Sequence, residues 1–273
     1  AAFKFWSSDN GEKNKDKNRL VAIVDVRKNS DSFIVKEAKR LGIKIYFNHA
    51  VTNTFGRKKI NSVIINELDE KIEKIIGKSI KLSCDLLCVS GGWTPTVHLF
   101  SQSKGKLIFR KSDSTFIPYK SFQNEISIGA CNGTFDKEEI FEETYNKMKI
   151  LIEEFGKEII DKEKYLNNKE DFFPSSNSKG VTYKTFSYSF NLNNMKNIWI
   201  VPSNKNFGKT KMFVDFQNDV TAKDIKLALK EGYKSIEHVK RYTTTGMATD
   251  QGKTSNINAL GIISQFSNKP IYE

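Results

Sequence analysis

The chain has 273 residues, of which 38% are hydrophobic and 28% charged, and its formal net charge is +12. This length allows one large or two modest domains with a sizeable core. No stretch approaches the run of about 18 apolar residues that a membrane span needs, so no membrane segment is expected. The lysines are spread along the chain rather than gathered in one aromatic-rich stripe, so we expect no nucleic-acid partner despite the charge.

Cysteine and histidine usage argues against a metal site. The chain has three residues of each kind, and their spacing matches no metal-binding pattern. They are Cys84, Cys88, Cys131, His49, His98 and His238. We therefore expect reduced thiols in a cytoplasmic protein, with no metal ligand.

The first predicted elements form a β-α-β unit. Residues 20–26 are a short apolar run bounded by charge, which is typical of a buried parallel strand. A helix is expected to begin after Ser30 or Asp31 and to end at Gly42, and residues 44–48 resume a strand. Such a unit is the building block of a doubly wound sheet.

Asp25 is a candidate nucleotide ligand at the end of the first strand, since an acidic residue there can accept hydrogen bonds from a ribose. The glycine-rich turn that should precede such a strand is absent from this chain. Asp25 is therefore a weaker candidate than the full fingerprint would give, and a purely structural role for the β-α-β unit stays open.

A β-meander is expected over residues 51–83, followed by an apolar strand that ends in Gly91 and Gly92. Small residues at a strand end let the backbone approach a cofactor closely, so Gly92 is a secondary candidate. The pattern predicts an α/β fold with a doubly wound, dinucleotide-binding core.

A second strand ending in small residues is expected at 124–135, before a long helix whose apolar residues recur from Ile140 to Phe155. The helix start lies near Gly129 and Gly133, and free N–H groups at a helix N-terminus can face a pyrophosphate. An ordinary strand-to-helix turn is the alternative.

Residues 213–273 predict a small helical module. Thr221 is expected to cap a helix, with Asp224 in the capping-box position, and Ser235 is expected to cap a second helix. A third helix is expected over residues 256–266.

Within this module, residues 246–256 read GMATDQGKTSN and end like a phosphate-binding P-loop. The P-loop needs a second glycine five positions before Gly252, where this chain has Met247. It also needs a preceding buried strand, where this chain predicts helix and turn. A nucleoside triphosphatase is therefore disfavoured, and a polar turn between two helices is the alternative.

Four stretches together resemble the alpha subunit of heterotetrameric sarcosine oxidase. They are CDLLCVSGGWTPTVHLFSQSKGKL at 84–107, SIGACNGTF at 127–135, FVDFQNDVTAKDIKLA at 213–228 and EHVKRYTTTGMATDQGKTSNINAL at 237–260. The resemblance implies that the chain is an internal fragment, which lacks the N-terminal part of the subunit and its C-terminal aminomethyltransferase-like part.

The resemblance implies a flavin-dependent oxidoreductase. The family demethylates sarcosine to glycine, transfers the one-carbon unit to tetrahydrofolate and passes electrons to oxygen. It implies NAD in the alpha subunit, FMN shared with the beta subunit, FAD in the beta subunit, and beta, gamma and delta subunits as partners. Sarcosine would be oxidised at the FAD of the beta subunit, and tetrahydrofolate would bind outside this fragment. The fragment is therefore expected to hold cofactors, to carry no catalytic residue and to be inactive alone.

The resemblance also assigns residues to cofactors. It implies NAD contacts at Gly129, Ala130 and Phe135, with Gly92 and Asp25 as weaker candidates. Ala130 and Cys131 stand where many related flavoproteins have a ribityl-binding Asp, which disfavours FAD at this turn. The residues implied at the FMN interface have hydroxyl, amide and cationic side chains. They are Thr244, Thr245, Gln251, Lys253 and Thr254.

The implied organisation has three parts. Residues 1–156 would form an incomplete dinucleotide-binding core of the FAD- or NAD(P)-binding, glutathione-reductase-like type. It would hold the inserted β-α-β unit and meander at about 20–83 and the return strands and helix at 84–156. Residues 157–212 form a linker region, and residues 213–273 form the helical module at the FMN and subunit interface.

The helical module resembles a bacterioferritin-associated-ferredoxin-like domain, whose relatives hold an iron–sulfur cluster through cysteines. The chain has no cysteine after Cys131, so no cluster is expected there. Two alternatives to sarcosine oxidase remain: a subunit of another flavin-dependent amine or opine dehydrogenase, and a non-catalytic basic binding module.

Overall fold

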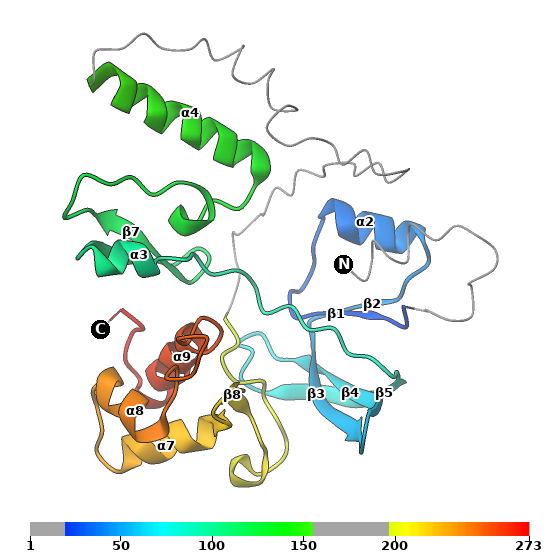
Figure 1. Ribbon diagram of the computed structural model, residues 1–273. Helices are drawn as coiled ribbons and strands as arrows, with labels where there is room; N and C mark the ends of the chain where they lie inside the picture. Colours follow the sequence, from blue (N-terminus) through cyan, green and yellow to red (C-terminus); the bar gives the residue numbers. More distant parts are fainter. Residues whose placement is uncertain (1–19, 155–196, 273) are drawn as a thin grey trace. The chain divides into compact units, whose positions relative to one another are not determined.

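The structure is a computed structural model that describes residues 20–154 and 197–272 (Figure 1). The chain divides into two compact units. Of the described residues, 20–91 and 197–271 belong to the first unit, and 92–154 and 272 belong to the second. Most of the predicted linker at 157–212 lies outside the described residues.

The predicted β-α-β unit is confirmed. Strand β1 (Ile23–Asp25) pairs in parallel with β2 (Ile45–Phe47), and helix α2 (Phe33–Arg40) connects them. The helix buries Val35 and Ala38, and its N-cap is Ser32, slightly later than the sequence pattern predicts.

The predicted meander is also confirmed. Strands β3 (His49–Gly56), β4 (Ile60–Leu68) and β5 (Ile75–Ser83) form a three-stranded antiparallel sheet in the order β3-β4-β5. The central strand β4 carries the core of this sheet, with Ile65 and Leu68 both 0% exposed.

The apolar stretch after β5 does not form the buried strand that its sequence predicts. Residues 84–91 have no regular secondary structure, and the side chains of Leu86 and Val89 are 73% and 81% exposed. An apolar strand is buried only when neighbouring elements cover it and pair its backbone. Within the described part of the chain, no strand pairs with this stretch.

The three helices predicted within residues 213–273 are present in the C-terminal part of the first unit. A short hairpin of β8 (Phe213–Asp215) and β9 (Val220–Thr221) leads into helices α7 (Ala222–Lys230), α8 (Ile236–Thr243) and α9 (Asn256–Ser267). The helices pack around one apolar core. It consists of Val214, Val220, Ala222, Ile225, Ala228, Val239, Ala259, Ile262 and Ile263.

Two local features fix this module. Thr221 and Asp224 form the predicted capping box, in which Oδ2 of Asp224 accepts the backbone N–H of Thr221 at 2.8 Å. On α9, a Cβ at Gly261 would lie 2.0 Å from the indole of Trp199, so only glycine lets the helix pack on that ring. Trp199 belongs to the stretch NIWIVPS, which has no regular secondary structure. A short 3-10 turn, η2 (Phe207–Lys209), follows it.

The second unit contains a helix, a hairpin and the predicted long helix. Helix α3 (His98–Gln102) precedes the antiparallel strands β6 (Lys106–Arg110) and β7 (Thr115–Lys120), a hairpin that the sequence analysis missed. Helix α4 (Lys137–Glu154) is confirmed. The strand predicted at 124–135 is wrong, because this stretch forms bends and the 3-10 turn η1 (Gly129–Asn132).

Among the described helices, none is long and apolar enough to cross a membrane.

Candidate functional site

The main candidate site is the loop of residues 244–254, which joins α8 to α9. Helix α8 ends at Thr243, and its C-cap Thr244 has a left-handed backbone with a φ of 61°. The five residues predicted to contact FMN all lie in this loop. The structure therefore brings them into one connection between two packed helices.

Two glycines close the loop on itself. Gly246 and Gly252 have φ values of 70° and 74°, a conformation that disfavours residues with a Cβ. A Cβ on either glycine would lie 2.2 Å or 2.1 Å from Oδ1 of Asn256, and a Cβ on Gly246 would also lie 3.3 Å from Cα of Gly252. The left-handed backbone of Gly252 and its close approach to the Asn256 amide both favour glycine there, which accounts for this residue without any bound phosphate.

An internal carboxylate engages two backbone donors of this loop, the N–H groups of Gly252 and Thr254. Asp250 accepts the N–H of Gly252 at 3.1 Å and the hydroxyl of Thr254 at 3.0 Å. The pKa of Asp250 is held below its ordinary value, mainly by the N–H of Gly252 and to a smaller extent by the N–H and hydroxyl of Thr254. In a P-loop these donors would face phosphate oxygens, so the structure adds a second reason against a triphosphatase.

The hydroxyls predicted for FMN binding already make internal hydrogen bonds. Thr245 is only 3% exposed, and its Oγ1 lies 2.7 Å from Oγ1 of Thr243. Thr244 donates its hydroxyl to the carbonyl of Thr243 at 2.6 Å. Since a hydroxyl has one donor, Thr244 and Thr254 are left as acceptors in this arrangement.

Lys253 and Gln251 remain the polar groups that face outward. Both side chains are exposed, and Nε2 of Gln251 donates to the carbonyl of Ala248 at 3.0 Å. Within the described residues, the Lys253 ammonium has no ion-pair partner. The loop therefore presents one cation together with amide and hydroxyl oxygens.

The β8–β9 turn, which was not predicted from the sequence, contacts this loop. Nδ2 of Asn218 donates to the carbonyl of Thr244 at 2.9 Å, and Oγ1 of Thr249 donates to Oε1 of Gln217 at 2.7 Å. The signal available in the sequence is the run Asp-Phe-Gln-Asn-Asp, since Asp and Asn favour tight turns. Nothing in that run identifies the distant loop that it contacts.

In the second unit, a carboxylate of helix α4 contacts the turn predicted to bind NAD. Glu143 on α4 accepts the backbone N–H of Gly129 at 2.9 Å and the side-chain amide of Asn132, and its Oε1 lies 3.1 Å from the ammonium of Lys147. Burial by itself would raise the pKa of Glu143, but the donors of Gly129, Asn132 and Lys147 outweigh it and hold this pKa below its ordinary value.

The rest of this turn is held by Arg110. Its Nη2 donates to the carbonyl of Gly133 at 2.9 Å, and its guanidinium forms a bidentate pair with Asp113. Of the predicted NAD residues, Ala130 is exposed, while the ring of Phe135 lies 6.0 Å from that of Trp93 between centroids. The outward features of the turn are therefore the Ala130 methyl and this aromatic pair.

The structure describes the local surroundings of the two weaker candidates, Asp25 and Gly92. Both carboxylate oxygens of Asp25 pair with Arg27, with Nε to Oδ1 at 3.0 Å and Nη2 to Oδ2 at 2.7 Å. Gly92 is exposed and has a φ of 108°. Asp25 lies in the first unit and Gly92 in the second.

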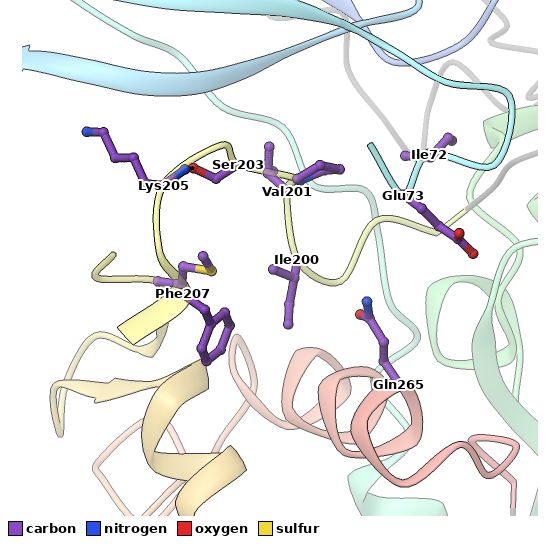
Figure 2. A pocket seen from close by; sticks show the side chains of 10 residues that line it. Ile72, Glu73, Ile200, Val201, Ser203, Lys205, Phe207 and Gln265 are labelled. Carbon is purple, nitrogen blue, oxygen red and sulfur yellow. Dashed lines mark hydrogen bonds between the residues drawn. The ribbon is translucent and has the colours of Figure 1, made fainter. Parts of the chain in front are cut away.

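A shallow cavity of about 180 Å³ lies elsewhere in the first unit (Figure 2). Ile200 and Phe207 point into it from one segment, while Glu73 and Lys205 provide charge at its edge. None of the residues predicted from sequence lines it. In the described part of the chain, no group of three or more His, Cys, Asp or Glu residues is placed to hold a metal ion.

Comparison with known proteins places the candidate loop in a named domain. Residues 209–273 match the family model of the sarcosine oxidase A3 domain. Over 250 residues, the chain is 30% identical to sarcosine oxidase subunit alpha of Corynebacterium sp. (strain P-1), covering 90% of this chain and 23% of that protein. Over 215 residues, it is 31% identical to the same subunit of Rhizobium meliloti (strain 1021), covering 79% of this chain and 19% of that protein.

The chain thus spans 19–23% of the length of these curated relatives. Among solved structures, it is similar to L-proline dehydrogenase from P. horikoshii, with a TM-score of 0.52 and 19% identity over 93% of this chain and 46% of that one. At this identity the likeness concerns the fold alone, and it agrees with the mixed α/β architecture seen here.

Proposed function

We propose, from the premise that this chain belongs to the family of sarcosine oxidase alpha subunits, that its loop 244–254 forms the alpha-subunit side of an FMN site. The observation that carries the proposal is Lys253, an exposed cation within the part that matches the A3 domain. A flavin phosphate is a strong acceptor that needs such a donor.

The donor set of the loop fits a flavin better than a triphosphate. The backbone N–H groups are partly engaged by Asp250, so phosphate binding falls to the Lys253 ammonium. The oxygens of Thr244, Thr254 and Gln251 suit the edge of an isoalloxazine ring, which has both donor and acceptor positions. When bound, FMN supplies electron transfer; the residues named here bind and orient it.

The proposal assigns NAD to the turn at Gly129, Ala130 and Phe135. Because Glu143 accepts the Gly129 N–H, we place the contact at the Ala130 methyl and the Phe135 ring rather than at a phosphate. A bound NAD there would be held for structure, since no acid, base or nucleophile of this chain is assigned to it.

For the whole protein, we propose oxidative demethylation of sarcosine to glycine, with the one-carbon unit passed to tetrahydrofolate and electrons to oxygen. The partners would be beta, gamma and delta subunits, with FAD in the beta subunit. This segment would bind cofactors and a neighbouring subunit, and it would be inactive alone.

The experiment is a visible absorption spectrum of the full-length subunit assembled with its partners, before and after sarcosine is added without oxygen. We expect a flavin spectrum that bleaches. The Lys253→Ala variant should lose FMN and keep NAD and FAD, whereas Lys223→Ala, which changes an exposed lysine on α7, should keep all three. Full FMN content in Lys253→Ala would contradict the site, and a flavin that ignores sarcosine would contradict the substrate.

A further inference from the structure

Asp215, the last residue of β8, is a buried carboxylate with a long-range role. The residue is only 2% exposed. Oδ2 accepts the backbone N–H of Gly246 at 2.7 Å and lies 3.4 Å from the hydroxyl of Ser255. Among the described residues, Asp215 has no Lys, Arg or His ion-pair partner, so hydrogen-bond donors alone compensate its burial.

The other oxygen of Asp215 shapes the β8–β9 turn. Oδ1 accepts the backbone N–H of Gln217 at 2.9 Å and that of Asn218 at 3.1 Å. Such side-chain bonds to the N–H groups two and three residues on define a tight turn. One carboxylate therefore joins the turn to the distant backbone at Gly246.

Two further side chains of this turn reach the same loop. Asn218 donates to the carbonyl of Thr244, and Gln217 accepts from Thr249. Together with the bond from Gly246 to Asp215, residues 215–218 contact the loop at three points, Thr244, Gly246 and Thr249. These three hydrogen bonds between one turn and the loop fix both the position and the orientation of the first half of the loop.

We infer that the β8–β9 turn holds loop 244–254 in its ligand-binding geometry, and that Asp215 is the positioning residue of this device. The flavin part of the inference rests on the proposed FMN function. Asp215 is too deeply buried to contact a cofactor, so it acts through the backbone of Gly246.

The chemistry of an asparagine substitution separates the two roles of Asp215. In Asp215→Asn, the remaining oxygen can still accept the N–H groups of Gln217 and Asn218 and preserve the turn. The new amide nitrogen is a donor that faces the donor N–H of Gly246. The substitution therefore removes the long-range tie while it leaves the local turn intact.

A control variant must destabilise the module without touching the loop. Asp224→Asn weakens the capping box of α7, where Oδ2 of Asp224 accepts the N–H and hydroxyl of Thr221. Asn218→Ala provides an independent test, since it removes the tie to Thr244 and leaves Asp215 unchanged.

The experiment measures two quantities in the full-length subunit assembled with its partners: the rate of FMN release, and the amide hydrogen exchange of residues 244–249. Asp215→Asn loses a hydrogen bond to a charged acceptor, which stabilises more than a neutral one does. We therefore expect both rates to rise about tenfold or more in this variant. Asn218→Ala should raise both rates less, and Asp224→Asn should change neither by more than about twofold at matched thermal stability.

The outcomes separate the inference from the function on which it rests. Equal effects of Asp215→Asn and Asp224→Asn on the loop would overturn the positioning role and show a general structural one. Faster amide exchange at 244–249 with unchanged FMN release would show that Asp215 positions the loop, but it would overturn the inference that this positioning serves flavin binding. If Lys253→Ala also kept its FMN, the proposed site itself would fail, whatever the exchange data showed.

Discussion

Glu143 accepts the backbone N–H of Gly129 at 2.9 Å and so joins helix α4 to the turn η1. The same carboxylate binds the amide of Asn132 and pairs with Lys147, whose ammonium also donates to the carbonyl of Ser127 at 2.7 Å. One side chain therefore fixes both the backbone of the turn and the start of the long helix.

This contact predicts that the second unit is less stable in acid. Because the pKa of Glu143 is depressed in the folded state, its stabilisation is present above the unfolded pKa and is lost as the pH falls through the folded one. We expect the thermal midpoint to fall on acidification below the ordinary range of a glutamate carboxyl, and to fall less in Glu143→Gln. Parallel pH curves for the two proteins would contradict this assignment.

The exposed stretch 84–91 gives a second prediction. Leu86→Ser and Val89→Ser should each change the free energy of unfolding by less than about 0.5 kcal/mol, since exposed side chains contribute little. Ile65→Ala, at a fully buried position of β4, should cost about 2–5 kcal/mol in the same denaturant titration. Losses of that size at Leu86 or Val89 would instead show the buried strand that the sequence pattern predicts.

The elements predicted correctly are those whose signals are local. The apolar spacing of α4 and the Thr221–Asp224 capping box lie within a few residues and do not depend on the rest of the chain. The stretch 84–91 was predicted wrongly because its apolar run becomes a strand only when another strand pairs with it. Pairing is a long-range property, and no described strand provides it.

The candidate site shows the same limit. The resemblance assigned Thr244, Gln251 and Lys253 to a flavin because hydroxyl, amide and cationic side chains suit its phosphate and ring, and this assignment stays a prediction. Two facts could not be identified: Thr245 is buried, and Asp250 engages the nearby N–H groups. Both depend on how the loop folds on itself.

Arg110 supports a third prediction, because a lysine cannot reproduce its contacts. The planar guanidinium binds Asp113 in bidentate fashion and also reaches the carbonyl of Gly133 at 2.9 Å. Lys106→Ala, at an exposed position of β6, is a matched control. We expect Arg110→Lys to lower the free energy of unfolding by about 1–3 kcal/mol and the control by less than about 0.5 kcal/mol, measured in urea. Equal stability of Arg110→Lys and the parent would show that charge alone suffices.

Gly252 gives the last prediction, which separates backbone strain from steric contact. Gly252→Ala places a Cβ at a φ of 74° and within 2.1 Å of Oδ1 of Asn256, so both effects act together. Left-handed backbone costs about 1–2 kcal/mol and overpacking about 1–3 kcal/mol, so the single variant should lose about 2–5 kcal/mol of unfolding free energy.

Asn256→Ala removes the opposing amide, whose own bond to the carbonyl of Gln251 is long at 3.4 Å, so this variant alone should cost little. In the double variant only the backbone strain at position 252 persists. Its loss should therefore be smaller than the sum of the two single losses by about 1–3 kcal/mol, measured as a double-mutant cycle in denaturant. Additive losses would mean that Asn256 moves aside freely, and the glycine would then be required by its backbone conformation alone.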